Sequence, residues 1–235
     1  MTSAAADYPA KYRERVHAGQ WFQSLTPLLQ DLLLAHMSIR PLAAGQRLFA
    51  RGDAADGLYC VADGSIKLTG STRDGKEAIL AIIEAPSWFG EIAAFDELTR
   101  THDAWADEPT TLLHIPAATL NTLLAQHPLL WHALGLLLSH KIRLAFLALE
   151  ELSLQPPASR LARRLLMMAR GYGELEGISK REIRVPQEQL GQMLALSRQT
   201  VNQLLRQLES HGVVRLGRGG IEILDLAQLE TLADL

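Results

Sequence analysis

The chain has 235 residues, of which 48% are apolar, and this is enough for one large or two modest domains with buried cores. Its net charge of −3 alone favours neither nucleic acid nor any other class of partner. The single cysteine, Cys60, excludes an internal disulfide and any cysteine-ligated iron–sulfur cluster or zinc finger.

Residues 1–20 are predicted to form an N-terminal tail. They contain no apolar stretch of the kind found in secretion signals, so we predict a soluble, cytoplasmic protein. From Trp21 to Met37, apolar residues recur at helical spacing, and this pattern predicts one or two short helices.

From Pro41 the pattern changes to short β-prone runs that are separated by turn residues. Asp-Gly pairs such as Asp63-Gly64 favour tight hairpins, because both turn positions need a positive φ. The runs cover residues 58–61, 65–69, 78–83 and 111–115. Many short strands at regular spacing predict a β-barrel, roll or sandwich that ends near Pro116. Helical spacing returns at residues 118–127, and we assign 21–127 to one domain.

Pro128 begins a predicted helix over residues 128–153, roughly 37 Å long. Leu130 and Leu137 lie on one of its faces, whereas Ile142 and Phe146 lie on others. A helix that is apolar on several faces is buried on several sides. We therefore predict a homodimer seam, with burial inside one domain as the alternative. A membrane span is disfavoured by the polar residues across its middle, which are His132, His140, Lys141 and Arg143.

Pro156-Pro157 ends this helix and marks a hinge, so residues 154–235 are assigned to a second domain. The charge balance changes at the same place. Residues 156–218 carry 11 Lys or Arg against 5 Asp or Glu, whereas residues 1–155 carry 12 against 17. This asymmetry predicts that only the C-terminal part contacts a polyanion, with chance clustering as the alternative.

Residues 185–223 have the pattern of two short helices followed by a hairpin. Ser197 is a suitable N-cap for the second helix, and Arg218 at the hairpin tip is a candidate for phosphate contact. The inward residues of that helix are Val201, Leu204, Leu205 and Leu208. Its outward face lacks acidic residues and carries side chains that pair with base edges. We predict a winged helix-turn-helix that binds double-stranded DNA, with a structural helical hairpin as the alternative. The predicted DNA-binding residues are Ser197, Arg198, Gln199, Thr200, Asn202, Gln203, Arg206 and Arg218.

At "LGQMLALSRQTVNQLLRQLESHGVV" the sequence resembles the Crp/Fnr family of bacterial transcription regulators, and the resemblance covers roughly residues 22–225. It implies an α+β fold with an N-terminal β-roll of the cyclic-nucleotide-binding type, a long dimerisation helix and a C-terminal winged helix. It also implies RNA polymerase as a partner. Ser197 and Arg198 match family positions that contact phosphate and guanine. Gln199 and Gln203 replace the Glu and Arg found in many members, which predicts an operator richer in adenine contacts.

The stretch "FGEIAAF" resembles the phosphate-binding segment of this family. There the amides after Gly90, including that of Ile92, lie at a short helix start, and Glu91 meets a ribose hydroxyl. These three residues are the first candidates for an effector site.

Other parts of that family site depart from its pattern. The arginine and the Ser or Thr that neutralise a phosphate fall on His102 and Asp103, and a carboxylate repels phosphate. Arg100 is the alternative cation. The hydroxyl pair that contacts the purine falls on Ala145 and Phe146, whose side chains make no hydrogen bonds. We predict that cyclic AMP is not the effector.

Several effectors stay open: another nucleotide, a small anion at Gly90 and Arg100, haem held through His102, His114 or His36, or none. The eight histidines show no H-x-H or H-E-x-x-H spacing, so no metal site is predicted.

Two other classes of function compete with a DNA-binding regulator. A metal-dependent enzyme on a β-barrel would need a histidine pair and a glutamate that are not visible, and no nucleophile accompanies Glu91, His102 and Asp103. A module that acts through protein partners alone leaves the arginine-and-amide face unexplained. We predict a regulator with no catalytic residues.

Overall fold

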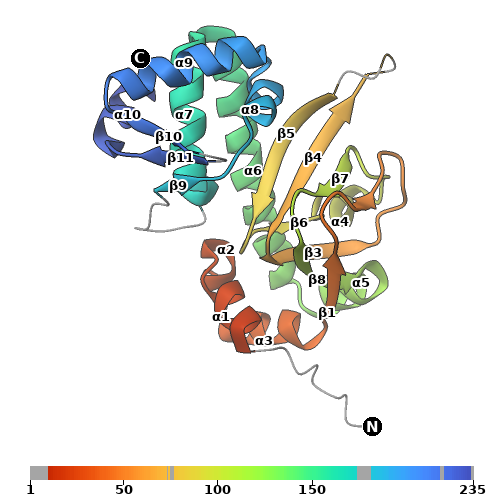
Figure 1. Cartoon of the computed structure of the whole chain (residues 1–235). Helices are drawn as coiled ribbons and strands as arrows, with labels where there is room; N and C mark the ends of the chain where they lie inside the picture. Colours follow the sequence, from red (N-terminus) through yellow and green to blue (C-terminus); the bar gives the residue numbers. More distant parts are fainter. Residues whose placement is uncertain (1–9, 73, 75–76, 174–180, 218–219, 234–235) are drawn as a thin grey trace. The chain divides into compact units, whose positions relative to one another are not determined.

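The computed structural model describes residues 10–72, 74, 77–173, 181–217 and 220–233. It divides into two compact units, one of Met1–Gly70 with Leu80–Ile142 and one of Ser71–Ile79 with Arg143–Leu235 (Figure 1). The first unit contains most of the predicted β-rich domain, and the second contains the predicted helix-turn-helix. The chain has the α+β class expected from its sequence.

From residue 10 onward, three helices precede the first strand: α1 (Ala10–His17), α2 (Gln20–Gln23) and α3 (Pro27–Ala35). The prediction of a tail over residues 1–20 missed α1, because this helix is mostly polar. Over residues 12–17, where its burial is described, only Val16 is fully buried. Phe22 stacks on Trp88 with ring centroids 5.6 Å apart. The helices predicted between Trp21 and Met37 are confirmed as α2 and α3.

Two four-stranded sheets build the β-roll, with strand orders β1-β8-β3-β6 and β2-β7-β4-β5. The strands are β1 (Ser38–Leu42), β2 (Arg47–Phe49), β3 (Gly57–Asp63), β4 (Ser65–Ser71), β5 (Glu77–Glu84), β6 (Trp88–Phe89), β7 (Asp103–Ala106) and β8 (Thr110–Pro116). The four predicted β-prone runs lie in β3, β4, β5 and β8. Gly64, with φ of 80°, lies at a bend between β3 and β4. The hairpin predicted at Asp63-Gly64 was wrong, because β3 and β4 belong to different sheets and Asp63 does not have a positive φ.

Strand β3 is apolar on both faces because each face belongs to a different core. Tyr59 and Val61 point into the cluster between the sheets, whereas Leu58 and Cys60 point into the cluster beneath the helices. Successive side chains of a strand alternate between faces, so a strand buried on both sides is continuously apolar. This explains why β3 lacks the alternating pattern of an exposed sheet.

Two helices follow the roll, α5 (Ala117–Gln126) and α6 (Leu129–Leu154). The predicted long helix is confirmed as α6, and its first half packs on the roll. Leu130, Leu134 and Leu137 are at most 2% exposed, and the Trp21 Nε1–H donates to the Ala133 carbonyl at 2.8 Å. From Ile142 onward most of the large apolar residues of α6 are exposed, and these are Ile142, Phe146, Leu147, Leu149, Leu152 and Leu154, whereas Leu144 is half-buried.

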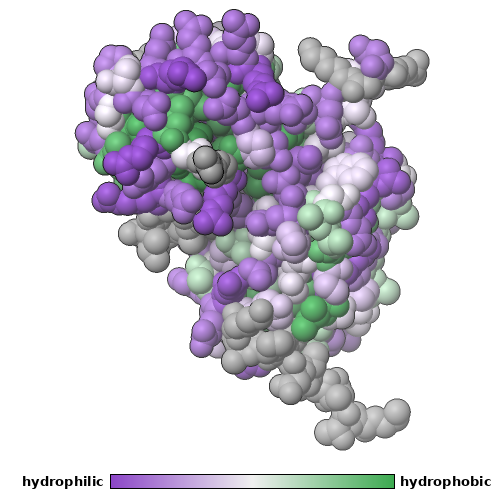
Figure 2. Space-filling model, viewed as in Figure 1, coloured by the Kyte–Doolittle hydropathy of each residue, from purple (hydrophilic) through white to green (hydrophobic). Residues whose placement is uncertain are grey.

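The second unit continues after Pro156, which is the N-cap of the next helix and confirms the predicted break. Its elements are α7 (Pro157–Ala169), β9 (Glu182–Ile183), α8 (Gln187–Leu194), α9 (Arg198–Ser210), β10 (Val214–Gly217), β11 (Gly220–Ile223) and α10 (Leu226–Ala233). The predicted hairpin is confirmed as β10 and β11, and β9 adds a third antiparallel strand beside β11. Figure 2 shows hydrophilic residues over most of the visible outer face of this unit.

Candidate nucleic-acid interface and effector site

A tight turn at residues 195–197 joins α8 to α9. Ala195 has the left-handed conformation with φ of 53°, and the Leu196 N–H donates to the Gly191 carbonyl at 3.0 Å. The Ser197 Oγ accepts a hydrogen bond from the Thr200 N–H at 3.0 Å, which confirms Ser197 as the N-cap of α9. These contacts fix the direction in which α9 leaves the turn.

Gly191 allows α8 to approach this turn closely. A Cβ at this position would lie 2.8 Å from the Leu196 carbonyl oxygen, a backbone atom that cannot rotate away. In an open helix a change from Gly to Ala stabilises, whereas here we expect Gly191→Ala to destabilise the second unit by about 1–3 kcal/mol. Denaturant unfolding followed by circular dichroism measures this, with Gln192→Ala on the same helix as control. Equal stability of Gly191→Ala and the natural chain would contradict the close approach.

The two faces of α9 differ as the sequence predicts. Val201, Leu205 and Leu208 are buried, and Leu204 is half-buried. The opposite side exposes Arg198, Gln199, Gln203 and Arg206, while Thr200 and Asn202 are half-buried. The helix lies along an outer edge of its unit (Figure 1). We call these four exposed side chains, Arg198, Gln199, Gln203 and Arg206, the recognition strip. Within this unit the strip is open to solvent, and its contacts with DNA stay a prediction.

Glu209, the acidic residue of α9, lies near the C-terminal end of the helix and is hydrogen-bonded to the hairpin. The Glu209 Oε1 accepts a hydrogen bond from the Leu216 N–H of β10 at 2.8 Å. Its charge is thus held beside the hairpin backbone rather than within the recognition strip. The predicted phosphate contact of Arg218 lies outside the described residues.

The Asn202 amide makes two hydrogen bonds inside the protein. Its Nδ2 donates to the Gln187 Oε1 of α8 at 3.0 Å, and its Oδ1 accepts from the Arg206 Nε at 3.0 Å. The three side chains therefore form a row that joins the start of α8 to the middle of α9.

In the roll, the predicted phosphate-binding segment precedes the short helix α4 (Ile92–Asp96). Gly90 has φ of 98°, and Glu91 is the N-cap of α4. Glu91 is 1% exposed, and its Oε2 lies 2.7 Å from the Lys141 Nζ of α6. The carboxylate predicted to meet a ribose is therefore neutralised by a lysine of the same chain.

Arg100 is also bound to a carboxylate of the chain. Its Nη2 donates to the Asp56 Oδ1 at 2.7 Å and to the Gly57 carbonyl at 3.0 Å. The guanidinium lies over the Phe49 ring, 4.4 Å from its centroid, and the residue is 7% exposed. A Cβ on Gly90 would lie 3.2 Å from the Arg100 Nη1, so a glycine gives this arginine its space.

Asp56 joins several polar groups of the roll. Tyr59 donates its hydroxyl hydrogen to the Asp56 Oδ2, and the Arg40 Nη1 lies 3.2 Å from the same oxygen. Burial raises the pKa of Asp56, but the hydrogen bonds from Tyr59 and Arg100 outweigh it and hold this pKa below its usual range. Burial and the bond to Asp56 raise the pKa of Tyr59. Sequence patterns singled out Arg100 but did not predict its contacts with this cluster, because the members come from separate strands and loops.

His102 and Asp103 are brought together beside Arg51. Burial and the nearby Arg51 guanidinium lower the pKa of His102, so its imidazole is neutral at pH 7. The Asp103 Oδ1 accepts a hydrogen bond from the Arg51 N–H at 2.8 Å. This pair therefore offers one carboxylate and no compensating imidazolium to an incoming anion.

Of the remaining candidates, His114 belongs to the Asp56 cluster, because its ring stacks on Tyr59 with centroids 4.4 Å apart. Ala145 and Phe146 lie on the part of α6 that belongs to the second unit, and Phe146 is 67% exposed. The His114 Nε2 lies 3.1 Å from the Asp56 carbonyl oxygen, and the His36 Nδ1 lies 2.8 Å from that of Leu32. Within the described residues, no group of three His, Cys, Asp or Glu side chains is placed to hold a metal ion.

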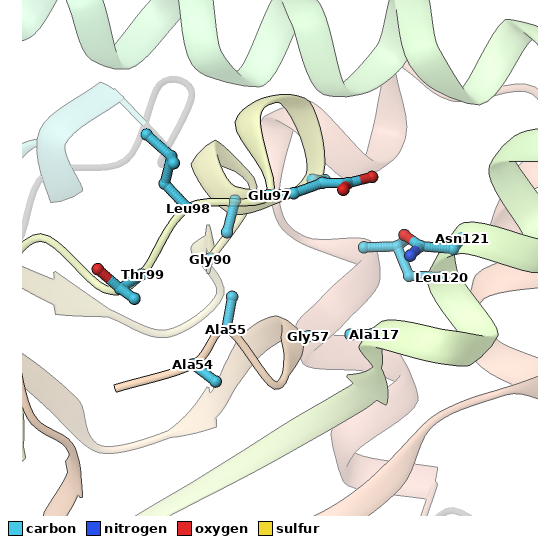
Figure 3. Close-up of a pocket in the computed structure, with 12 residues that line it drawn as sticks. Ala54, Ala55, Gly57, Gly90, Glu97, Leu98, Thr99, Ala117, Leu120 and Asn121 are labelled. Carbon is cyan, nitrogen blue, oxygen red and sulfur yellow. The ribbon is translucent and has the colours of Figure 1, made fainter. Parts of the chain in front are cut away.

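A cavity of about 340 Å³ lies beside α4 (Figure 3). Its lining consists mainly of small and apolar residues: Ala54, Ala55, Gly57, Gly90, Ala93, Ala94, Glu97, Leu98, Thr99, Ala117, Leu120 and Asn121. Glu97 extends from the end of α4 toward α5, which carries Leu120 and Asn121. The described lining supplies a carboxylate and no basic side chain, so this cavity is unsuited to a phosphate.

Two family models match the chain. Residues 39–127 match the cyclic nucleotide-binding domain, and residues 159–232 match the Crp-like helix-turn-helix domain. These matches correspond to the roll with its following helix and to the region of α7 to α10.

Similar proteins extend over nearly the whole chain. The cyclic AMP receptor protein of Thermus thermophilus is 35% identical over 213 residues, which cover 90% of this chain and 95% of the relative. A CRP-like cAMP-activated global transcriptional regulator of Mycobacterium tuberculosis is 28% identical over 209 residues, with coverage of 88% and 93%. The solved structure of FixK2 from Bradyrhizobium japonicum has a TM-score of 0.75 and covers 83% of this chain and 96% of its own; at 18% identity it shows the fold alone.

Proposed function

Because this chain belongs to the Crp/Fnr family of transcriptional regulators, we propose that it binds DNA as a homodimer whose two α9 helices enter successive major grooves. The relatives are regulators rather than enzymes. The observation that carries the proposal is the face of α9, where Arg198, Gln199 and Gln203 are exposed above buried apolar residues. Family membership adds RNA polymerase as the expected protein partner, and we propose a cytoplasmic location because that is where a bacterial regulator meets DNA.

The homodimer is supported by an apolar row along α6 that is exposed or half-buried in the single chain. Its positions alternate in spacing between four and three residues, which is the heptad pattern of a two-stranded coiled coil. The row is Trp131, Gly135, Leu138, Ile142, Ala145, Leu149 and Leu152. Ile142, Leu149 and Leu152 are 46%, 59% and 51% exposed in the single chain. A second copy of α6 would bury them, and Gly135 would let the two helices approach closely.

A bilayer is the other environment that could cover this helix, because α6 has the length and hydropathy of a membrane span. Lys141 and Arg143 lie in the middle of α6, and each would cost roughly 2.5–3.5 kcal/mol at the centre of a membrane. Lys141 is also paired with Glu91 of the roll. These charges favour a second copy of the chain as the cover.

The recognition strip favours an operator in which the protein contacts adenine bases as well as guanine. Arg198 has the donors for guanine, whereas Gln199 and Gln203 each offer the donor and acceptor that adenine requires. Selection from a random duplex library with the full chain tests this. We expect two inverted half-sites about 10 base pairs apart, which is one duplex turn. Failure to enrich any sequence would contradict the proposal.

We further propose that the roll does not take cyclic AMP, although the names of the relatives make it the first effector to test. A cyclic phosphate needs a free cation, and two cations beside the Gly90-Glu91 segment are already paired with carboxylates, Arg100 with Asp56 and Lys141 with Glu91. The pKa of His102 is lowered, so this histidine supplies no charge at neutral pH. Another nucleotide, another small anion, haem or no effector remains as the alternative.

Calorimetric titration of the full chain with cyclic AMP tests this proposal. We expect no saturable heat for the natural sequence up to about millimolar nucleotide, the weak end of specific binding. The double variant His102→Arg with Asp103→Ser restores the family pair and should gain measurable affinity. Saturable micromolar binding by the natural chain would contradict the proposal. Native mass spectrometry of the freshly purified protein then reveals any other small molecule retained by the roll.

A further inference from the structure

The hydrogen bonds of Asn202 determine how its amide is oriented. The Nε of an arginine can only donate, so the atom of Asn202 that faces Arg206 must be the carbonyl oxygen. The amino group then faces the Gln187 Oε1, to which it donates at 3.0 Å. Both edges of the amide are thus directed at protein groups in one consistent pattern.

This arrangement conflicts with direct base reading by Asn202. An asparagine recognises adenine by presenting its oxygen and its amino group to the base together. In Asn202 the oxygen is used by Arg206 and the amino group by Gln187. The side chain is also half-buried, whereas Arg198, Gln199 and Gln203 of the same helix are exposed.

We infer that Asn202 is a positioning residue, which acts on DNA specificity through Arg206 rather than by contacting a base. The inference rests on the proposed binding of DNA by α9. Asn202 holds the Arg206 Nε, and in the described part of the chain no hydrogen bond occupies the two terminal nitrogens of Arg206. Those nitrogens form the fork that pairs with the two acceptors of guanine or with phosphate oxygens.

The hydrogen bond between Asn202 and Arg206 would raise the affinity for DNA because it orders the arginine side chain before DNA binds. A long exposed side chain loses rotamer freedom when it binds, and this loss is smaller when the protein already holds the side chain. Arg198, the other arginine of α9, provides the comparison, because no described residue makes a hydrogen bond with its side chain. Gln187 of α8 accepts a hydrogen bond from Asn202. The position of Arg206 therefore depends on both helices of the motif.

A double-mutant cycle on the selected operator tests this inference. Binding of the full chain is measured by fluorescence anisotropy for Asn202→Ala, Arg206→Ala and the double variant. We expect each single variant to bind the operator about tenfold more weakly, and the double variant to be no weaker than Arg206→Ala within about twofold. The control cycle pairs Asn202→Ala with Arg198→Ala, whose losses should multiply because Arg198 is held independently.

The base preferences of the variants supply a second readout that a purely structural role would not move. Asn202→Ala and Arg206→Ala should relax discrimination at the same base pair and leave the other positions unchanged. Circular dichroism confirms that each variant is folded. Gln187→Ala, which removes only the outer link, should cause a smaller loss at that base pair.

Two results would overturn the inference. One is multiplication of the Asn202→Ala and Arg206→Ala losses, which would mean that Asn202 contacts DNA itself. The other is unchanged affinity and base preference in Asn202→Ala. Failure of the natural chain to bind any duplex is a different result, because it rejects the proposed function before the cycle can be measured.

Discussion

Ile142→Asp is expected to dissociate the homodimer and to remove tight binding to the operator. In a paired α6, the two substituted residues would place two carboxylates in an apolar seam without a counter-charge. A buried unpaired charge costs roughly 3 kcal/mol or more, which is a loss of at least about 100-fold in the dimerisation constant. Sedimentation velocity over a dilution series measures this constant directly, and anisotropy on the operator follows its consequence for DNA.

Leu147→Asp is the matched control for this prediction. Leu147 lies on the same helix and is 43% exposed, close to the 46% of Ile142, but it occupies the heptad position farthest from the row. We expect this variant to remain dimeric. Equal dissociation by both substitutions would show that the row from Trp131 to Leu152 is not the seam.

Arg198→Ala is expected to weaken binding to the operator by about 1–3 kcal/mol and to relax specificity at one base pair. Arg198 is the first residue of α9, and the Ser197 cap fixes this end of the helix. The N-terminal residues of a recognition helix are those that reach base edges. Anisotropy competition with the operator and with its single-base variants measures both the loss and its position.

Binding to random duplex provides the comparison for Arg198. A contact to a base contributes little there, so the natural chain and Arg198→Ala should bind random DNA alike. Arg218→Ala, at a position outside the described residues, should instead weaken operator and random DNA by the same factor. Equal losses of Arg198→Ala on both duplexes would exclude its role in reading a base.

Elements with local signals could be predicted from the sequence. Gly64 has the positive φ that its place after Asp63 indicates, although the strands on either side of it belong to different sheets and form no hairpin. Ser197 caps α9 because its side chain and the Thr200 amide lie three residues apart, which is a local interaction. The apolar spacing of α6 and α9 likewise identified both helices, since the period of a helix repeats within a few residues.

Features that depend on tertiary contacts could not be predicted in the same way. The pairing of Arg100 with Asp56 joins residues 44 positions apart, and that of Lys141 with Glu91 joins residues 50 positions apart. No periodic pattern marks such pairs. The hydrogen bond from Asn202 to Gln187 could not be predicted either, because the two residues lie on different helices. Strand β9 has two residues, which is too short to show alternation.

The central claim is that the recognition strip of α9 lies in the major groove of duplex DNA. The dependence of duplex binding on salt tests it. If the two recognition helices of a dimer contact the phosphate backbone, binding to the selected operator should weaken by about 10³-fold or more between about 50 mM and about 200 mM salt. Binding to random duplex should weaken in parallel from a much lower affinity. An absence of duplex binding at about 50 mM salt, or an affinity that does not change across this range, would contradict the account.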